Sequence, residues 1–167
     1  MEIKLPFLQT ELPQDYGKYA AKENRLAGKP VVSFPFTIKD APAGTKSFAL
    51  TFIDHDAVPV AGFSWIHWLA ANIEQSEIPA NFSQLAPSSV KQGFNSNISK
   101  FVGETNPALT SYYTGPMPPN GDHAYTLTVY AVDKLLPLPN NYYLNDLYHA
   151  LTGHTLAKTS LDIISKA

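Results

Sequence analysis

The chain has 167 residues, of which 44% are hydrophobic and 16% are charged, and its formal net charge at pH 7 is -2. This length suits one domain with a sizeable core, so we expect residues 1–167 to form a single domain. The 12 basic residues form no run or stripe, which argues against binding of nucleic acid through its phosphates. The absence of cysteine excludes disulfides and thiolate chemistry.

The first residues, MEIKLPFLQTELPQDYG, contain no long apolar run and are interrupted by Pro6 and Pro13. They do not resemble a secretory signal. No stretch of the sequence approaches the roughly 18 consecutive apolar residues of a membrane-spanning helix, so we expect no stable membrane insertion. We therefore expect a cytoplasmic protein.

The 14 prolines are spread from Pro6 to Pro139 and predict short strands joined by turns. A weak strand candidate covers residues 30–38, PVVSFPFTI, where Pro35 favours an edge or bulged strand. Residues 47–54, SFALTFID, predict a strand that is apolar on both faces and hence buried on both sides. Residues 75–110 are polar and poorly periodic, and we expect long loops there.

The segment Ser64–Ile73, SWIHWLAANI, is the next predicted strand, and it is also apolar on both faces. Strict alternation places Trp65 with Leu69 on one face and Ile66 with Trp68 on the other. Residues 124–132 alternate in the same way and are rich in β-forming residue types, which predicts a third strand.

The C-terminal part has a different pattern, because residues 141–167 contain no proline. The leucines of residues 144–151 have helical spacing, and Gly153 is a suitable end for that helix. A second stripe, Ala157, Leu161 and Ile164, also has helical spacing. We therefore expect C-terminal helices on a mainly β chain.

Polar groups that could carry chemistry stand at the ends of these strands. Asp54 and Asp56 are two residues apart, so they point the same way in extended backbone; the alternative is an ordinary strand-end turn. His67 lies between two tryptophans and needs a hydrogen-bond partner; the alternative is a satisfied core histidine.

A third candidate is the loop GPMPPNG, residues 115–121, which precedes His123. Its prolines fix φ and make the loop stiff, and Asn-Gly favours a tight turn. His123 and Tyr125 then share a strand face. The alternative is a well-made hairpin corner whose polar residues have no function.

Taken together, these residues suit the binding of a small anion. Histidine N–H, tyrosine O–H and loop N–H groups are donors for phosphate or carboxylate oxygens. Aspartates would repel a bare anion, but they fit if they orient the histidines and keep them protonated, or if the ligand also carries an ammonium group. A phosphate–ammonium zwitterion would satisfy both sets of groups.

Four ordered motifs are similar to those of a known family: DHDAVP (54–59), HW (67–68), YTGPMPP (113–119) and GDHAY (121–125). They resemble the phosphatidylethanolamine-binding protein family, in its bacterial Raf-kinase-inhibitor-like branch. Weaker similarity extends the resemblance over most of the chain. Among the departures from the family pattern, His55 replaces a proline, Val58 is an additional residue, and Ala124 replaces an arginine.

The resemblance implies an antiparallel β-sandwich with Greek-key connections and C-terminal helices. It also implies a small pocket for phosphate-type or phosphoethanolamine-like groups, on a phosphorylated small molecule or a phospho-residue. Some relatives modulate kinases or proteases, and bacterial relatives are often homodimers. By position, the pocket would be lined or supported by Asp54, Asp56, His67, Tyr113, Gly115, Pro116, His123 and Tyr125.

Two other functions remain open at this point. A hydrolase would need a nucleophile, and Ser64, Ser111 and Tyr113 are the nearest candidates, but none lies in a Gly-x-Ser-x-Gly motif. A metal site could use His67, His123 and one aspartate, although no local ligand spacing supports it. We therefore favour a non-catalytic binding protein and expect no catalytic residue, metal or cofactor.

Overall fold

Strands form most of the regular structure in the computed structural model, which describes residues 1–167 except for the side chain of Gln9. The helices are short, and the longest of those described has eight residues. Within the described part of the chain, no helix is long and apolar enough to cross a membrane. The chain is thus mainly β with a few short helices.

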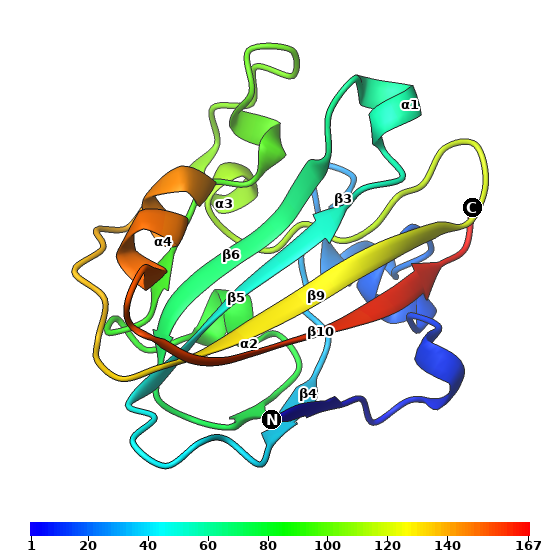
Figure 1. Ribbon diagram of the computed structural model, residues 1–167. Coiled ribbons are helices and arrows are strands. Elements are labelled where there is room, and N and C mark those ends of the chain that lie inside the picture. Colours follow the sequence, from blue (N-terminus) through cyan, green and yellow to red (C-terminus); the bar gives the residue numbers. More distant parts are fainter.

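The central element is a five-stranded sheet in which all neighbouring strands are antiparallel (Figure 1). Its strands, in spatial order, are β10 (Thr155–Ser165), β9 (His123–Val132), β5 (Ser47–Asp54), β6 (Trp65–Ile73) and β8 (Lys91–Gln92). β5 is buried along its whole length, as its two-sided apolar pattern predicts. The three strands predicted most clearly are therefore confirmed, each to within one residue.

Two smaller sheets accompany the central one. They comprise β1 (Glu2–Lys4), β4 (Phe36–Lys39) and β7 (Glu77–Ile78), and the pair β2 (Arg25–Leu26) and β3 (Lys29–Pro30). The three-stranded sheet shares a hydrophobic core with the central sheet, in which Phe36 and Ile38 of β4 join Phe48, Leu50 and Phe52 of β5. Removal of these side chains from water stabilises the contact between the two sheets.

The opposite face of the central sheet is covered by α4 (Leu144–Leu151), shown in orange in Figure 1. Leu147 and Leu151 of this helix are buried in a second cluster with Leu69 and Val132 of the sheet. The helix stops two residues before Gly153, whose φ of 77° lies in the left-handed region. The first of the two predicted C-terminal helices is confirmed.

The remaining helices are single turns in the connections. They are α1 (Val58–Ala61), α2 (Phe82–Leu85), α3 (Pro107–Thr110), η1 (Leu8–Thr10), η2 (Gln14–Tyr16), η3 (Lys22–Asn24) and η4 (Ser96–Ile98). The weak strand predicted over residues 30–38 is only partly present, as the end of β3 and most of β4. The segment between them has no strand structure.

The second predicted C-terminal helix is wrong, because residues 155–165 form the strand β10. Ala157, Leu161 and Ile164 fit a helical period, but the same segment also alternates with a period of two. Lys158 and Asp162 are exposed, whereas the residue that precedes each of them, Ala157 and Leu161, is partly buried. β9 offers a long partner with which β10 pairs from Val132 to His123, and this tertiary pairing decides the outcome.

Candidate functional site

Side chains from three adjacent strands meet at one end of the central sheet. Asp54 is the last residue of β5 and lies opposite Tyr125 of β9 and Trp65 of β6. His123 begins β9, and His67 lies near the start of β6. All five residues line one cavity of about 320 Å³. The structure therefore brings the two predicted histidines and Asp54 together.

A β-bulge in β6 explains how His67 reaches this cavity. Phe52 of β5 lies opposite Trp68, and the next residue, Ile53, lies opposite Ile66. His67 is thus an extra residue without a partner in β5, and a bulge of this kind re-aims side chains. The expectation that Ile66 and Trp68 share a face is wrong: Trp68 packs between the sheets, whereas Ile66 packs against the cluster beneath α4.

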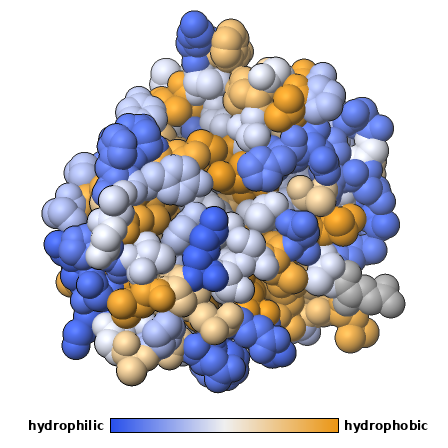
Figure 2. Space-filling model, in the orientation of Figure 1, coloured by the Kyte–Doolittle hydropathy of each residue, from blue (hydrophilic) through white to orange (hydrophobic). Residues whose placement is uncertain are grey.

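The walls of the cavity are largely apolar. They come from α1, the loop before β9 and the segment near residue 102, which Figure 1 shows at the same end of the central sheet. Figure 2 shows hydrophobic residues at the surface in the region of α1. Val60 of this helix is half-exposed. The lining residues are Lys29, Asp54, Ala57, Val60, Ala61, Trp65, His67, Asn97, Val102, Thr114, Gly115, Met117, Pro118, Pro119, His123 and Tyr125.

Asp54 and His123 form a buried pair at the base of the cavity. The Nδ1 atom of His123 lies 2.8 Å from Oδ2 of Asp54, and both side chains are almost fully buried. The other carboxylate oxygen of Asp54 accepts a hydrogen bond from the backbone N–H of Ala57 at 3.0 Å. The Nε2 atom of His123 faces the amide oxygen of Asn120, an exposed residue, at 3.0 Å. Asp54 therefore fixes the ring, and only a surface side chain covers its second nitrogen.

His67 is held by the loop rather than by an acid. Its Nδ1–H donates to the backbone carbonyl of Thr114 at 2.7 Å. Burial, with a smaller contribution from His123, lowers the pKa of His67, while Thr114 and Asp54 raise it, and the net result is a pKa of about 4. The ring is thus neutral at pH 7. Of the two roles considered for the aspartates, keeping the histidines protonated does not apply to His67, because desolvation outweighs the attraction of Asp54.

Two tyrosines predicted for the site have different surroundings. Burial and the charge of Asp54 raise the pKa of Tyr125, so its hydroxyl remains a hydrogen-bond donor in the cavity lining. Tyr113 is fully buried, and its hydroxyl donates to the backbone carbonyl of Tyr16 at 2.7 Å. Tyr113 therefore fixes the start of the loop to the backbone of Tyr16 and does not line the cavity.

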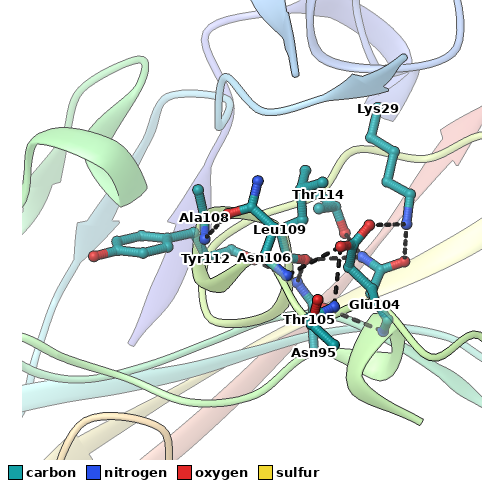
Figure 3. A network of polar contacts seen from close by, with 10 residues as sticks. Lys29, Asn95, Glu104, Thr105, Asn106, Ala108, Leu109, Tyr112 and Thr114 are labelled. Atoms are coloured by element: carbon teal, nitrogen blue, oxygen red, sulfur yellow. Dashed lines mark hydrogen bonds and ion pairs between the residues drawn. The ribbon is translucent and has the colours of Figure 1, made fainter. Parts of the chain in front are cut away.

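Lys29 also lines the cavity, although nothing in the sequence pattern singles it out. Its ammonium donates to Oδ1 of Asn97 at 2.7 Å and lies 3.8 Å from a carboxylate oxygen of Glu104 (Figure 3). Backbone N–H groups of residues 105 and 106 also bind Glu104, and these contacts together with Lys29 lower the pKa of that carboxyl. Lys29 brings a positive charge to the cavity from β3, far away in the sequence.

The proline-rich loop forms one wall, and close packing fixes its position. A Cβ atom on Gly115 would lie 2.2 Å from the carbonyl oxygen of Tyr16, so only glycine fits there. The backbone N–H of Gly115 donates to the carbonyl of Pro30 at 2.9 Å. The carbonyl of Pro118 accepts from the ammonium of Lys18 at 3.0 Å. The stiff loop thus has fixed contacts on its outer side and lines the cavity with its inner side.

Five of the eight predicted site residues line the cavity, namely Asp54, His67, Gly115, His123 and Tyr125. The other three, Asp56, Tyr113 and Pro116, lie outside the lining. Asp56 is exposed, and its carboxylate accepts a hydrogen bond from the backbone N–H of Ala124 at 2.9 Å. Pro116 is buried in the loop. These three residues support the loop and the strand start rather than forming the cavity surface.

The alternatives to a binding site gain no support. None of the three nucleophile candidates lines the cavity: Ser64 contacts His55, Ser111 is buried beside Thr110, and Tyr113 is bound to Tyr16. Among the described residues, no group of three or more histidine, aspartate or glutamate side chains is arranged to hold a metal ion.

Comparison with known proteins identifies the family. The model of the phosphatidylethanolamine-binding protein family matches residues 6–165. The uncharacterized protein YxkA of Bacillus subtilis is 48% identical over 157 residues, which cover 93% of this chain and 94% of that protein. A UPF0098 protein of Chlamydia muridarum is 32% identical over 149 residues, which cover 87% and 89%. The chain belongs to the phosphatidylethanolamine-binding protein family.

Solved structures agree with this assignment at the level of the fold. A homologue of phosphatidylethanolamine-binding protein from Chlamydia trachomatis superposes with a TM-score of 0.74 and 24% identity, covering 99% of this chain and 96% of that one. Escherichia coli YbcL, described as a member of the same family, gives a TM-score of 0.72 with 22% identity, covering 99% and 94%. The resemblance inferred from the four sequence motifs is confirmed.

Proposed function

We propose that this chain is a non-catalytic binding protein whose cavity holds a phosphate-type or phosphoethanolamine-like group. The observation that carries the proposal is the meeting of the buried Asp54–His123 pair, His67 and the Tyr125 hydroxyl in one cavity. His123 and Tyr125 provide donors, and Lys29 provides a positive charge. Such donors suit an anion with several acceptor oxygens.

The surroundings of these donors also support binding rather than catalysis. The donors are fixed in advance by the sheet and the proline loop, so they lose little entropy when a ligand binds. The Asp54 carboxylate is already engaged with His123 and with the backbone N–H of Ala57, which reduces its repulsion of an anion. A ligand oxygen could replace the exposed Asn120 at Nε2 of His123 without disturbing the buried pair.

The finer expectations from the family resemblance belong to the same proposal. The core shared by the three-stranded and central sheets supports a β-sandwich, for which we infer Greek-key connections. A phosphorylated side chain on a kinase or protease would present the same chemical group as a small phosphate ester. This chemistry is consistent with a Raf-kinase-inhibitor-like role. From the family resemblance and the sequence we also propose a homodimer and a cytoplasmic location.

Calorimetric titration of the chain with inorganic phosphate and with phosphoethanolamine tests this function. We expect saturable binding, and we expect His123→Ala to weaken it about tenfold or more, because a charge-assisted hydrogen bond is lost. His154→Ala is a matched control, since His154 pairs with Asp133 on the exposed surface. No binding at ligand concentrations on the order of millimolar, or equal binding by wild type and His123→Ala, would contradict the proposal.

A further inference from the structure

The two ring nitrogens of His67 have different roles in the cavity. A carbonyl oxygen can only accept a hydrogen bond, so the contact of Nδ1 with the carbonyl of Thr114 at 2.7 Å places the proton of the neutral ring on Nδ1. Nε2 then carries a lone pair and is an acceptor. Among the described residues, no hydrogen-bond partner faces Nε2. The ring lines the cavity, so a guest in the cavity must satisfy this acceptor.

The surroundings of His67 keep it an acceptor. The ring packs against Phe52 and Tyr125, with ring centroids 6.0 and 5.1 Å away, and 7% of the residue is exposed. Burial lowers its pKa to about 4. The charged groups near it, Asp54 and His123, are paired with each other. Protonation of Nε2 by its own surroundings is therefore unfavourable near neutral pH.

The other polar groups that a guest meets are donors or are already paired, since the Asp54 carboxylate is engaged by His123 and by the N–H of Ala57. Tyr125 keeps its hydroxyl proton, and the Lys29 ammonium is a hydrogen-bond donor. His123 offers a second N–H wherever a ligand displaces Asn120. The cavity thus presents several donors, the paired Asp54 carboxylate and one buried ring nitrogen, Nε2 of His67, whose lone pair has no partner among the described residues. A matching ligand has several bare oxygens and one O–H group.

We propose that His67 makes this cavity selective for an oxyanion that carries a proton, so that hydrogen phosphate and protonated phosphate esters bind whereas sulfate is rejected. Hydrogen phosphate and sulfate have the same tetrahedral shape and the same charge. They differ in the O–H group that can donate to Nε2 of His67. Sulfate would place a bare oxygen against the lone pair and leave a buried acceptor without a partner.

This inference rests on the proposed function, and the test separates the two. The chain is titrated calorimetrically with inorganic phosphate and with sodium sulfate near neutral pH and at equal ionic strength. We expect phosphate to bind at least about tenfold more tightly, given the usual cost of an unsatisfied buried acceptor. Equal affinities would overturn the selectivity and leave the anion site standing. No binding of either anion would overturn both proposals.

The variant His67→Gln tests whether His67 is the cause of the selectivity. The amide of His67→Gln can turn either its oxygen or its N–H groups toward the ligand, so it accommodates a bare oxygen. We expect the phosphate-to-sulfate affinity ratio to fall to about one, mainly through a gain in sulfate binding. Met117→Leu, a change at the half-exposed rim, is the control and should keep the wild-type ratio. A folded His67→Gln protein with an unchanged ratio would refute the role of His67; if the variant does not fold, the wild-type ratio alone decides.

Discussion

The molecule contains two histidine–aspartate pairs of similar geometry in very different surroundings. His123 and Asp54 are 2.8 Å apart, with 6% and 5% of their side chains exposed. His154 and Asp133 are 3.0 Å apart, with 39% and 41% exposed. Water screens the second pair and can replace either partner, whereas the first pair has no such substitute. We therefore expect burial, rather than the distance between the groups, to determine how much each pair contributes to the stability of this protein.

The largest effect should come from breaking the buried pair. Asp54→Ala leaves the buried His123 ring and the N–H of Ala57 without their acceptor. We expect it to lower the free energy of unfolding by about 3 kcal/mol or more, because removal of one partner of a buried pair is strongly destabilising. Asp133→Ala should change stability by less than about 1 kcal/mol. Urea denaturation of both variants checks this; similar losses would remove the distinction between the pairs.

The next effect concerns a buried histidine that has no acid partner. The pKa of His67 is about 4 in the folded chain and 6.5 in its ordinary state. Below pH 6.5 the unfolded chain gains a proton that the folded chain does not bind, so stability is complete above this pH and falls as the pH drops toward 4. The full shift corresponds to about 3 kcal/mol.

Urea unfolding at a series of pH values measures this contribution. The acidic residues titrate in wild type and in His67→Gln alike, so the difference between the two proteins isolates His67. We expect the variant to lose less stability on acidification. Parallel pH profiles would show that folding does not lower the pKa of His67.

A smaller loss of stability is expected at one of the two glycines of the proline-rich loop. A Cβ atom on Gly115 would press on the backbone of Tyr16, whereas a Cβ on Gly121 would meet nothing within 4 Å. Gly115→Ala should therefore destabilise the fold by about 2 kcal/mol through overpacking and should also weaken phosphate binding. Thermal denaturation checks the change, with Gly121→Ala as the control; equal melting temperatures would contradict it.

The smallest effect should be a gain. Asn120 is exposed and covers Nε2 of His123, so it competes with a ligand for this N–H group. We expect Asn120→Ala to tighten phosphate binding about threefold to tenfold, equivalent to one ordinary hydrogen bond, with little change in stability. Asn145→Ala removes an exposed amide on α4 and is the control. Weaker binding by Asn120→Ala would mean that Asn120 contacts the ligand instead of competing with it.

Much of the fold could be predicted because its strongest signals are local. The two-sided apolar run of residues 47–54 and the alternation in residues 124–132 predict β5 and β9 closely, and the leucine spacing predicts α4. β10 could not be predicted with the same security. Its apolar residues fit two periods, and the choice depends on pairing with β9, which is a tertiary contact.

The site shows the same limit. Asp54, His67 and His123 were found because they stand out as polar residues beside apolar strands. Lys29 was missed because a surface lysine near a turn is ordinary in sequence, and only the path of β3 brings it to the cavity. The neutral state of His67 was missed because desolvation depends on what packs around the ring.

The extra residue at His67 has a counterpart farther along β6. The β5–β6 register shifts a second time between the partners of Phe48 and Leu50, near Asn72, whose φ of 62° is left-handed. Each extra residue changes whether odd or even positions of β6 face the core between the sheets. After both extra residues, the strand end has the same alternation as the strand start. Ile66 and Trp68 already lie opposite neighbouring residues of β5, so deleting only the extra residue between them should leave both on their present faces. Deleting a paired residue of β6 should instead turn the strand beyond it over.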